Sequence, residues 1–363
     1  MADAQPFRAV RYSGAAGALA DLVAPPYDAV SEDERAVLHA RSPYNVVHLT
    51  LPTSIESAAL LYRRWLEAGI LERDDGPSAW LLVEDFVGPD GVARERQGVI
   101  VSVAAEPYEQ GTVLPHERTH AAIRANRLAL LRALRVQPEP LLLLLDGTLE
   151  LPSPRRPADL EVPGSRLWRL PDLDGEPLAD AVLLIADGHH RYESALALGG
   201  ELRSGRARVP ALVVARDDPG LRVFPTHRVF AGRPDLADRR EGEIMASLEE
   251  ALAALAAEPF TRSAAVAYRR GSVALVRGHE GELDVELVDR HGLSGISYTP
   301  RAAEATRAVD AGVADVAYLL REPRVEDIFV VARRGERMPP KSTYFFPKPL
   351  AGLLFHEVEG REA

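Results

Sequence analysis

Apolar and polar positions repeat with two different periods along this chain, and the longer period marks helices. Apolar residues recur at three- and four-residue spacing from about residue 53 to 69 and again from 121 to 134, which predicts two amphipathic helices. A further helix is expected after Ser31, which suits an N-cap, with Glu34 placed to complete a capping box.

Shorter apolar runs between these helices predict strands. Two runs flank the Gly-Pro-Asp-Gly turn at residues 88–91, which favours a β-hairpin. The uninterrupted leucines at 141–145 predict a buried strand. Helices and strands therefore alternate over the first 150 residues.

The second half of the chain begins with a stretch rich in proline and charge at residues 151–164, which we expect to be a linker. A strand, a helix and a second strand are expected between residues 181 and 216. Further along, helices are expected at 241–258 and 325–336, and strands near 264–270, 272–278 and 284–289. The expected fold class is mixed α/β, in three regions at 1–150, 151–235 and 236–363.

Composition excludes several classes of function. The chain has 363 residues and no cysteine, so it has no disulfide, thiolate metal site or cysteine nucleophile. Its net charge of −11 argues against a general nucleic-acid binder, which needs basic residues to neutralise phosphates. The longest clean apolar run, 141–145, is far shorter than the ~20 residues that span a bilayer. With no secretory signal at its start, we expect a cytoplasmic protein without a membrane partner.

The sequence Asp187-Gly188-His189-His190-Arg191 lies where an apolar strand turns into a helix. Such a turn aims free backbone N–H groups and the positive end of the helix dipole at one point, where a phosphate binds favourably. Gly188 to Arg191 are the predicted phosphate or cofactor ligands. Asp187, His189 and His190 are predicted catalytic residues, and Asp187 is also a candidate magnesium ligand. The simpler interpretation is a capping Asp187 beside two solvated histidines, but this concentration of polar groups favours a ligand site.

The strand, the string GHHRYESA and the following VPALVV resemble the nucleotide-binding core of the ParB/sulfiredoxin-like superfamily, in which a Gly-x-x-Arg turn holds nucleotide phosphates. Sulfiredoxins carry a cysteine after the glycine, whereas this chain has His189, so sulfinic acid reduction is not implied. The turn is closer to that of the free serine kinases of this superfamily. The resemblance implies a phosphate-binding turn at Gly188 to Arg191 and a transfer role for Asp187.

Over its whole length the chain resembles the bacterial and archaeal family called domain of unknown function 1015. The strings that carry this resemblance are APPYD, NVVHLTLP, RERQG, PHERT, ADGHHRYESA, PTHR and MPPKSTYFFPKP. That family implies no established reaction, so the mechanism is inferred from the residues.

Within PHERT and the residue after it, His116 to His120 formally match the His-Glu-x-x-His pattern of zinc proteases. That chemistry needs the pattern inside a long helix, and Pro115 places it at a helix start at best. We expect His116 and Arg118 to bind substrate, and Glu117 to act as a general base or a metal ligand with Asp187. The alternative is an N-cap at Thr119 beside a solvated acid, and the two remain about equal.

The C-terminal string MPPKSTYFFPKP is not a Walker P-loop, because the glycines before the lysine are missing. Its Lys341, Ser342, Thr343 and Lys348 are predicted substrate ligands that donate to phosphate or carboxylate oxygens.

Two isolated residues complete the predicted substrate site. Asp28 of APPYD and Asn45 of NVVHL lie in or beside segments rich in proline, where ligand groups are common. Each is alternatively a turn residue or a buried hydrogen-bonding residue.

These residues predict a nucleotide- or phosphate-binding enzyme that uses ATP or ADP with Mg²⁺. The expected reaction is phosphoryl transfer to or from a small polar metabolite, and the expected partner is a small anionic ligand. One alternative is a non-catalytic sensor of a nucleotide or metabolite. Another is a metal-dependent hydrolase that uses His116, Glu117, Asp187 and His190.

Overall fold

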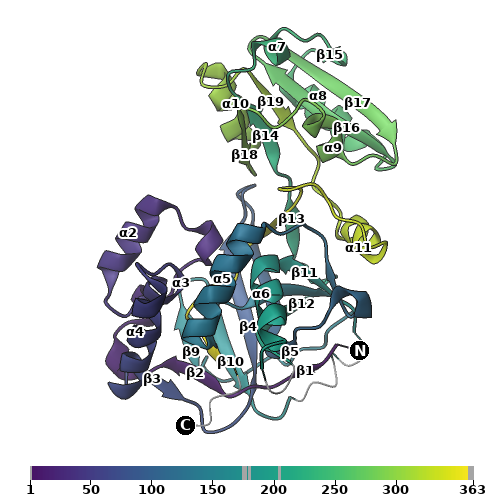
Figure 1. Ribbon diagram of the computed structural model, residues 1–363. Helices are drawn as coiled ribbons and strands as arrows, with labels where there is room; N and C mark the ends of the chain where they lie inside the picture. Colours follow the sequence, from purple (N-terminus) through teal and green to yellow (C-terminus); the bar gives the residue numbers. More distant parts are fainter. Residues whose placement is uncertain (1, 174–177, 179–180, 203–205, 359–363) are drawn as a thin grey trace.

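The computed structural model describes residues 2–173, 178, 181–202 and 206–358. Helices and mixed sheets alternate in it, so the expected mixed α/β class is confirmed. Figure 1 shows a larger lobe below and a smaller lobe, drawn mainly in green, above it. None of the helices in this described part is long and apolar enough to cross a membrane.

A nine-stranded mixed sheet forms the centre of the larger lobe. In spatial order its strands are β6 (Val113–Pro115), β11 (Leu183–Asp187), β8 (Leu141–Leu145), β12 (Arg208–Ala215), β5 (Ala93–Ala104), β4 (Ala79–Val87), β10 (Ser165–Leu170) and β9 (Leu160–Val162), and β1 (Ala4–Gln5) pairs with β5. The leucines of β8 point alternately into two cores, one beneath helices α5 (Ala121–Leu134) and α6 (His189–Gly199), the other beneath α11 (Val325–Arg333). A strand buried on both faces is apolar throughout, which explains the leucine run.

Two small sheets and several short helices complete the larger lobe. The sheets are β3 (Leu71–Arg73), β2 (Ala9–Tyr12), β21 (Phe355–Glu357) and β7 (Val136–Gln137), and the pair β13 (Arg222–Phe224) and β20 (Tyr344–Phe346). The helices are α1 (Leu19–Leu22), α2 (Glu32–Arg41), α3 (Val47–Thr50) and α4 (Ile55–Glu67), with 3₁₀ turns at Gly14–Ala16, Tyr27–Ala29 and Tyr108–Gln110.

The smaller lobe is a six-stranded sheet with four helices. Its strands, in spatial order, are β15 (Glu243–Met245), β17 (Ser272–Glu280), β16 (Arg262–Arg269), β19 (Val316–Leu319), β14 (His227–Phe230) and β18 (Ile296–Thr299), and its helices are α7 (Pro234–Ala237), α8 (Leu248–Ala257), α9 (Asp284–Asp289) and α10 (Ala302–Asp310). The chain enters through β14 and leaves through β19, and these strands are antiparallel neighbours.

The two lobes have separate hydrophobic cores. Buried core residues of the larger lobe come from 2–223 and 328–358, and those of the smaller lobe from 229–320. The boundary expected at residues 150–151 falls between β8 and β9, which belong to one sheet. The boundary expected at 235–236 falls inside the smaller lobe. Pairing between strands far apart in the sequence decides which strands belong to which lobe. Local sequence patterns do not show this pairing.

Several local predictions are confirmed. The hydroxyl of Ser31 accepts the N–H of Glu34, and the Glu34 carboxylate accepts the N–H of Ser31, so the capping box is complete. The α5 helix occupies residues 121–134, as its periodicity predicts. The hairpin of β4 and β5 and the order β11, α6, β12 are also as expected.

Three local predictions are wrong. The presumed linker at 151–164 contains β9, which pairs with β10 at the sheet edge. Residues 284–289 form α9 rather than a strand, because the carboxylate of Glu286 accepts the N–H of Leu283 and caps a helical turn. Of the helix expected over 241–258, only the part that forms α8 is helical. The hydroxyl of Ser247 accepts the N–H of Glu250 and so begins the helix there, and β15 precedes it.

Candidate functional site

The strings that contain Asp28, Glu117, Asp187 and Lys341 converge on one cavity of about 780 Å³. The larger lobe and the returning C-terminal segment supply Tyr27, Asp28, Glu117, Arg118, His120, residues 186–190, Lys341, Thr343, Tyr344 and Lys348. Thr226 and the end of β18 with the next residue, 297–300, supply another part of the wall. The cavity therefore lies where the two lobes meet. Figure 1 shows β18 at the end of the smaller lobe that is nearest the larger lobe.

The turn before α6 is open to this cavity. Gly188 has φ +98°, a left-handed conformation that side chains disfavour, and a Cβ there would lie 2.5 Å from Cδ2 of Leu141. Gly188 is the N-cap of α6, and no side chain of the described residues caps the helix. The first N–H groups of α6 are therefore available to a ligand, with the positive end of the helix dipole behind them.

Lys348 forms ion pairs with two carboxylates in the cavity, those of Asp187 and Asp28. The Nζ of Lys348 lies 2.8 Å from Oδ1 of Asp187 and 3.0 Å from Oδ1 of Asp28. Burial alone would raise the pKa of Asp187, but the charges of Lys348 and Arg191 outweigh it and hold this pKa below its ordinary value. Burial likewise opposes the charge of Lys348, yet the two carboxylates raise its pKa above its ordinary value. Asp187 and Lys348 are therefore both ionised at neutral pH.

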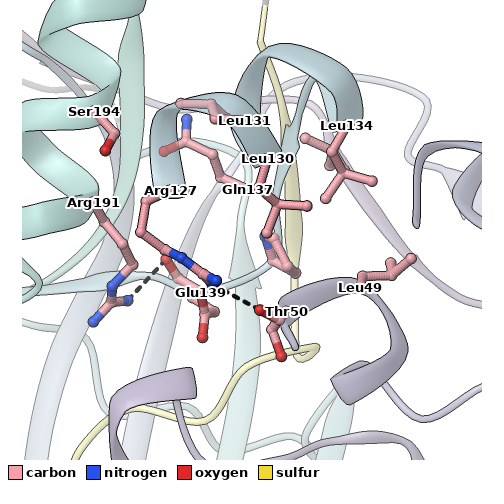
Figure 2. Close-up of a pocket in the computed structure, with 12 residues that line it drawn as sticks. Leu49, Thr50, Arg127, Leu130, Leu131, Leu134, Gln137, Glu139, Arg191 and Ser194 are labelled. Atoms are coloured by element: carbon pink, nitrogen blue, oxygen red, sulfur yellow. Dashed lines mark hydrogen bonds between the residues drawn. The ribbon is translucent and has the colours of Figure 1, made fainter. Parts of the chain in front are cut away.

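Arg191 lies behind Asp187 rather than in the cavity. Its guanidinium pairs with Oδ2 of Asp187 and donates to the carbonyl oxygens of Glu139 (3.1 Å) and Pro140 (2.7 Å). The side chain is buried and borders a separate cavity of about 50 Å³ below α5, shown in Figure 2. Arg191, predicted to contact phosphate, thus does not line the cavity and instead fixes Asp187 against the main chain.

The two histidines hold the PHERT loop against α6. The N–H of His116 donates to Nε2 of His189 (3.3 Å), and the N–H of His120 donates to Nε2 of His190 (2.9 Å). Burial lowers the pKa of both His189 and His190, which keeps these acceptor nitrogens unprotonated. Both histidines line the cavity, and the contacts they make are those of anchors for the loop.

His116 is buried, does not line the cavity, and orients Thr343. Its Nδ1 donates to the carbonyl oxygen of Ile185 (2.7 Å), so its Nε2 accepts from the hydroxyl of Thr343 (2.9 Å). Burial lowers the pKa of His116 to about 4. His116 is therefore neutral and positions Thr343 rather than contacting a ligand in the cavity.

Glu117 lines the cavity beside the string that carries Lys341. Its Oε1 accepts the N–H of Lys341 (3.4 Å). Burial raises the pKa of Glu117, and the N–H and charge of Lys341 only partly oppose this shift. A carboxylate with a raised pKa suits proton transfer near neutral pH. Arg118 and Lys341 are exposed beside it.

Two predicted substrate ligands lie elsewhere. Asn45 is fully buried, donates to the carbonyl oxygens of Asp21 and Val23, and accepts the N–H of Val47, so it holds the main chain. Ser342 is buried and donates to the carbonyl oxygen of Pro339, outside the cavity.

The predicted metal site at Asp187 and Glu117 does not fit the structure. Within the described residues, no three His, Asp or Glu side chains are arranged to hold a metal ion. Both oxygens of Asp187 already have cationic partners, Lys348 and Arg191. Lys348 thus occupies the place expected for a cation.

Sequence reasoning missed several lining residues. Ser297, Tyr298 and Thr299 come from β18 of the smaller lobe and have no motif around them. Tyr27 and Tyr344 belong to strings already singled out, and their position beside Asp28 and Thr343 was the available signal. The lysines offered another signal. The sequence has 43 lysines and arginines, and Lys341 and Lys348 are its only lysines.

The chain is similar to a curated protein and to several solved structures. The chain is 24% identical over 187 residues to the ADP-dependent L-serine kinase SerK of Thermococcus kodakarensis, covering 50% of this chain and 74% of that protein. Among solved structures, a free serine kinase in complex with AMP is 19% identical, with a TM-score of 0.42, over 68% of this chain and 86% of that one. A conserved hypothetical protein from Pyrococcus furiosus is 18% identical, with a TM-score of 0.40, over 70% and 93%.

A family model shows to which protein family the chain belongs. The model described as a protein of unknown function, DUF1015, matches residues 4–289, which is most of the chain. The strings that line the cavity up to His190 lie inside this range, as does β14 of the smaller lobe. The chain therefore belongs to the DUF1015 family.

Proposed function

We propose that this protein binds an adenine nucleotide in the cavity between its lobes and transfers a phosphoryl group to the hydroxyl of a small polar metabolite. One observation carries the proposal: the open N-terminus of α6, both lysines and three carboxylates face the same cavity. Helix N–H groups and lysines suit phosphate oxygens, and carboxylates suit a hydroxyl or ammonium group. A site of about 780 Å³ has room for a nucleotide and a small acceptor together.

The residues divide into two groups in this proposal. The N–H groups of α6, Lys341 and Lys348 hold the phosphates and stabilise the charge of the transferred group. Glu117 accepts the proton of the acceptor hydroxyl, whose oxygen forms the new bond to phosphorus. The bond from phosphorus to the nucleotide oxygen breaks, and the shortened nucleotide leaves with that electron pair.

Similarity to an ADP-dependent L-serine kinase supports ADP as the first donor and L-serine as the first acceptor to test. With this pair the products are AMP and phosphoserine. No step here depends on a metal ion, because Lys348 neutralises the carboxylates that a metal ion would otherwise contact.

Calorimetry with ADP, ATP, AMP and CTP, each with and without Mg²⁺, tests binding. Mass spectrometry of mixtures with L-serine and other small hydroxy and amino acids tests transfer. Glu117→Gln should keep ADP binding and lose transfer, while Glu109→Gln, which changes an exposed acid outside the cavity, should keep both. Absence of binding by every nucleotide contradicts the proposal, and binding without transfer to any acceptor favours the sensor.

A further inference from the structure

Arg96 is a fully buried arginine that contacts the main chain beside Lys348. It lies in β5 opposite Glu84 of β4, and its Nε and Nη2 both donate to the Glu84 carboxylate. Nη2 also donates to the carbonyl oxygen of Pro347, at 2.8 Å. Pro347 directly precedes Lys348, so this hydrogen bond fixes the backbone from which that lysine extends.

Arg228, in β14 of the smaller lobe, repeats this arrangement at the other lysine. It is also fully buried, and its Nε lies 3.2 Å from Oδ1 of Asp289. Its Nη1 donates to the carbonyl oxygen of Lys341, at 2.9 Å. Lys341 has φ +58°, a left-handed conformation that is uncommon outside glycine, so its backbone needs a specific restraint.

Stability alone does not account for these two arginines. Each keeps one buried nitrogen without a hydrogen-bond partner in the described part of the chain, Nη1 of Arg96 and Nη2 of Arg228. Burying a guanidinium costs free energy that its ion pair does not fully recover, and an unsatisfied N–H adds to the cost. What the two share is a hydrogen bond to a carbonyl at or next to a lysine of the cavity.

We infer that Arg96 and Arg228 are positioning residues, one from each lobe, that hold Lys348 and Lys341 in place for the anionic ligand of the proposed function. Arg96 keeps Lys348 within reach of Asp187 and Asp28. Arg228 ties the loop that carries Lys341 to the sheet of the smaller lobe. Neither arginine lines the cavity, so both act through the main chain.

Amine acylation tests the role of Arg96, because each lysine can be followed separately by peptide mass spectrometry. In the wild type, N-hydroxysuccinimidyl acetate at pH 8 should modify Lys348 slowly, since two carboxylates hold its charged form. Arg96→Met should speed acylation of Lys348 about tenfold, the factor expected for losing one hydrogen bond to a charged group. Acylation of Lys341 should not change.

Cleavage by endoproteinase Lys-C tests the role of Arg228. Lys348 is followed by proline, so the susceptible bond follows Lys341, and its carbonyl is the one that Arg228 holds. Arg228→Met should speed cleavage of the native protein about tenfold on the same reasoning. Acylation of Lys348 should stay at the wild-type rate.

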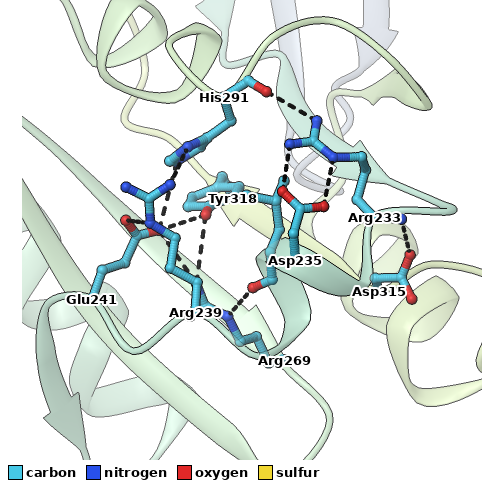
Figure 3. Close-up of polar contacts among 9 residues, drawn as sticks. Arg233, Asp235, Arg239, Glu241, Arg269, His291, Asp315 and Tyr318 are labelled. Carbon is cyan, nitrogen blue, oxygen red and sulfur yellow. Dashed lines mark hydrogen bonds and ion pairs between the residues drawn. The ribbon is translucent and has the colours of Figure 1, made fainter.

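Arg269 provides a matched control in the smaller lobe. It is also buried, donates to the carbonyl oxygen of Leu236 (2.8 Å) and pairs with Glu241, in the cluster of Figure 3, which contains neither lysine. Arg269→Met should change neither readout. The inference fails if this variant matches the other two, or if those two leave the lysines at wild-type rates.

The design distinguishes a loss of the positioning roles from a folding defect and from a failure of the proposed function. If either single variant unfolds, Glu84→Met with Arg96→Met, or Asp289→Asn with Arg228→Met, removes both charges of the pair and should restore the fold while keeping the altered lysine readout. Both readouts are taken without nucleotide. A failure to bind ADP would therefore count against the proposed function and leave the positioning roles standing.

Discussion

Replacing Lys348 by methionine should both destabilise the fold and weaken ADP binding. Methionine keeps most of the side-chain volume and removes the charge that bridges Asp187 and Asp28. The two carboxylates would then face each other without the ammonium group between them. Arg191 would remain beside Asp187 as its one strong cationic partner.

The size of the effect follows from the exposure of each partner. The side chains of Lys348 and Asp187 are 20% and 10% exposed, while that of Asp28 is 37% exposed. Removing one partner of a buried ion pair costs about 3–5 kcal/mol, and an exposed pair contributes about 0–1 kcal/mol. Because Arg191 still neutralises Asp187, the lower end applies, and we expect a loss of about 3 kcal/mol at pH 7.

The pH dependence of this loss has a definite sign. The pKa of Asp187 is held below its ordinary value in the folded state, so its stabilising contribution is present above the unfolded pKa and disappears as pH falls through the folded one. The difference between wild type and variant should therefore be full at pH 7 and shrink below about pH 4.

Urea unfolding followed by tryptophan fluorescence measures the loss at pH 7 and at the lowest pH at which the wild type stays folded. Calorimetry should show ADP affinity reduced at least about tenfold, since a hydrogen bond to a charged group is lost. Lys341→Met is the control for stability, because Lys341 is exposed and forms no ion pair in the described part of the chain. If Lys348→Met unfolds at the same urea concentration as the wild type, or if its loss of unfolding free energy is as large in acid as at pH 7, the electrostatic reasoning is refuted.

Three further predictions concern Gly188, Asn45 and three buried histidines. Gly188→Ala should destabilise the fold by about 2–4 kcal/mol, because its φ of +98° is strained for alanine and the new Cβ meets Leu141, and urea unfolding measures this; wild-type stability would contradict it. Asn45→Ala should cost about 3 kcal/mol of unfolding free energy and leave ADP affinity unchanged in calorimetry, because Asn45 bonds only main-chain groups; a selective loss of affinity would restore it as a ligand. Burial lowers the pKa of His116, His227 and His356 to about 4, so stability should be full above pH 6.5 and fall by up to about 3 kcal/mol per histidine toward pH 4. His356→Gln should make this fall shallower in urea unfolding at pH 5 and 7, and an unchanged slope would count against the assignment.

Local patterns were sufficient for much of the fold. The period of α5 and the leucine run of β8 follow from burial on one or both faces, and both match the sequence prediction. The six residues of α9 were harder, because a short apolar pattern fits a strand or a helical turn equally, and a side-chain cap decided between them. The arrangement of strands depends on contacts between β5, β12 and β8, which the sequence does not state locally.

The residues of the candidate site likewise fall into those that the sequence could predict and those that it could not. The turn at Gly188 could be predicted because only a few residue types allow an open helix N-terminus after a strand. The roles of Asn45 and Arg191 could not, because a polar residue that holds the main chain and one that binds a ligand look alike in sequence. Ser297 and Thr299 gave no signal at all, since only the folded smaller lobe brings β18 to the cavity.

The smaller lobe is entered and left through two adjacent strands, and its core shares no buried residue with that of the larger lobe. It is thus a module inserted into the sequence of its host, and it also contacts the larger lobe through Arg228 and the half-buried Leu283. Mutations at 296–299 can alter which molecules enter the cavity without disturbing the sheet that carries α6 and Asp187. We therefore expect substitutions on β18 to change ligand choice more than they change the stability of the larger lobe.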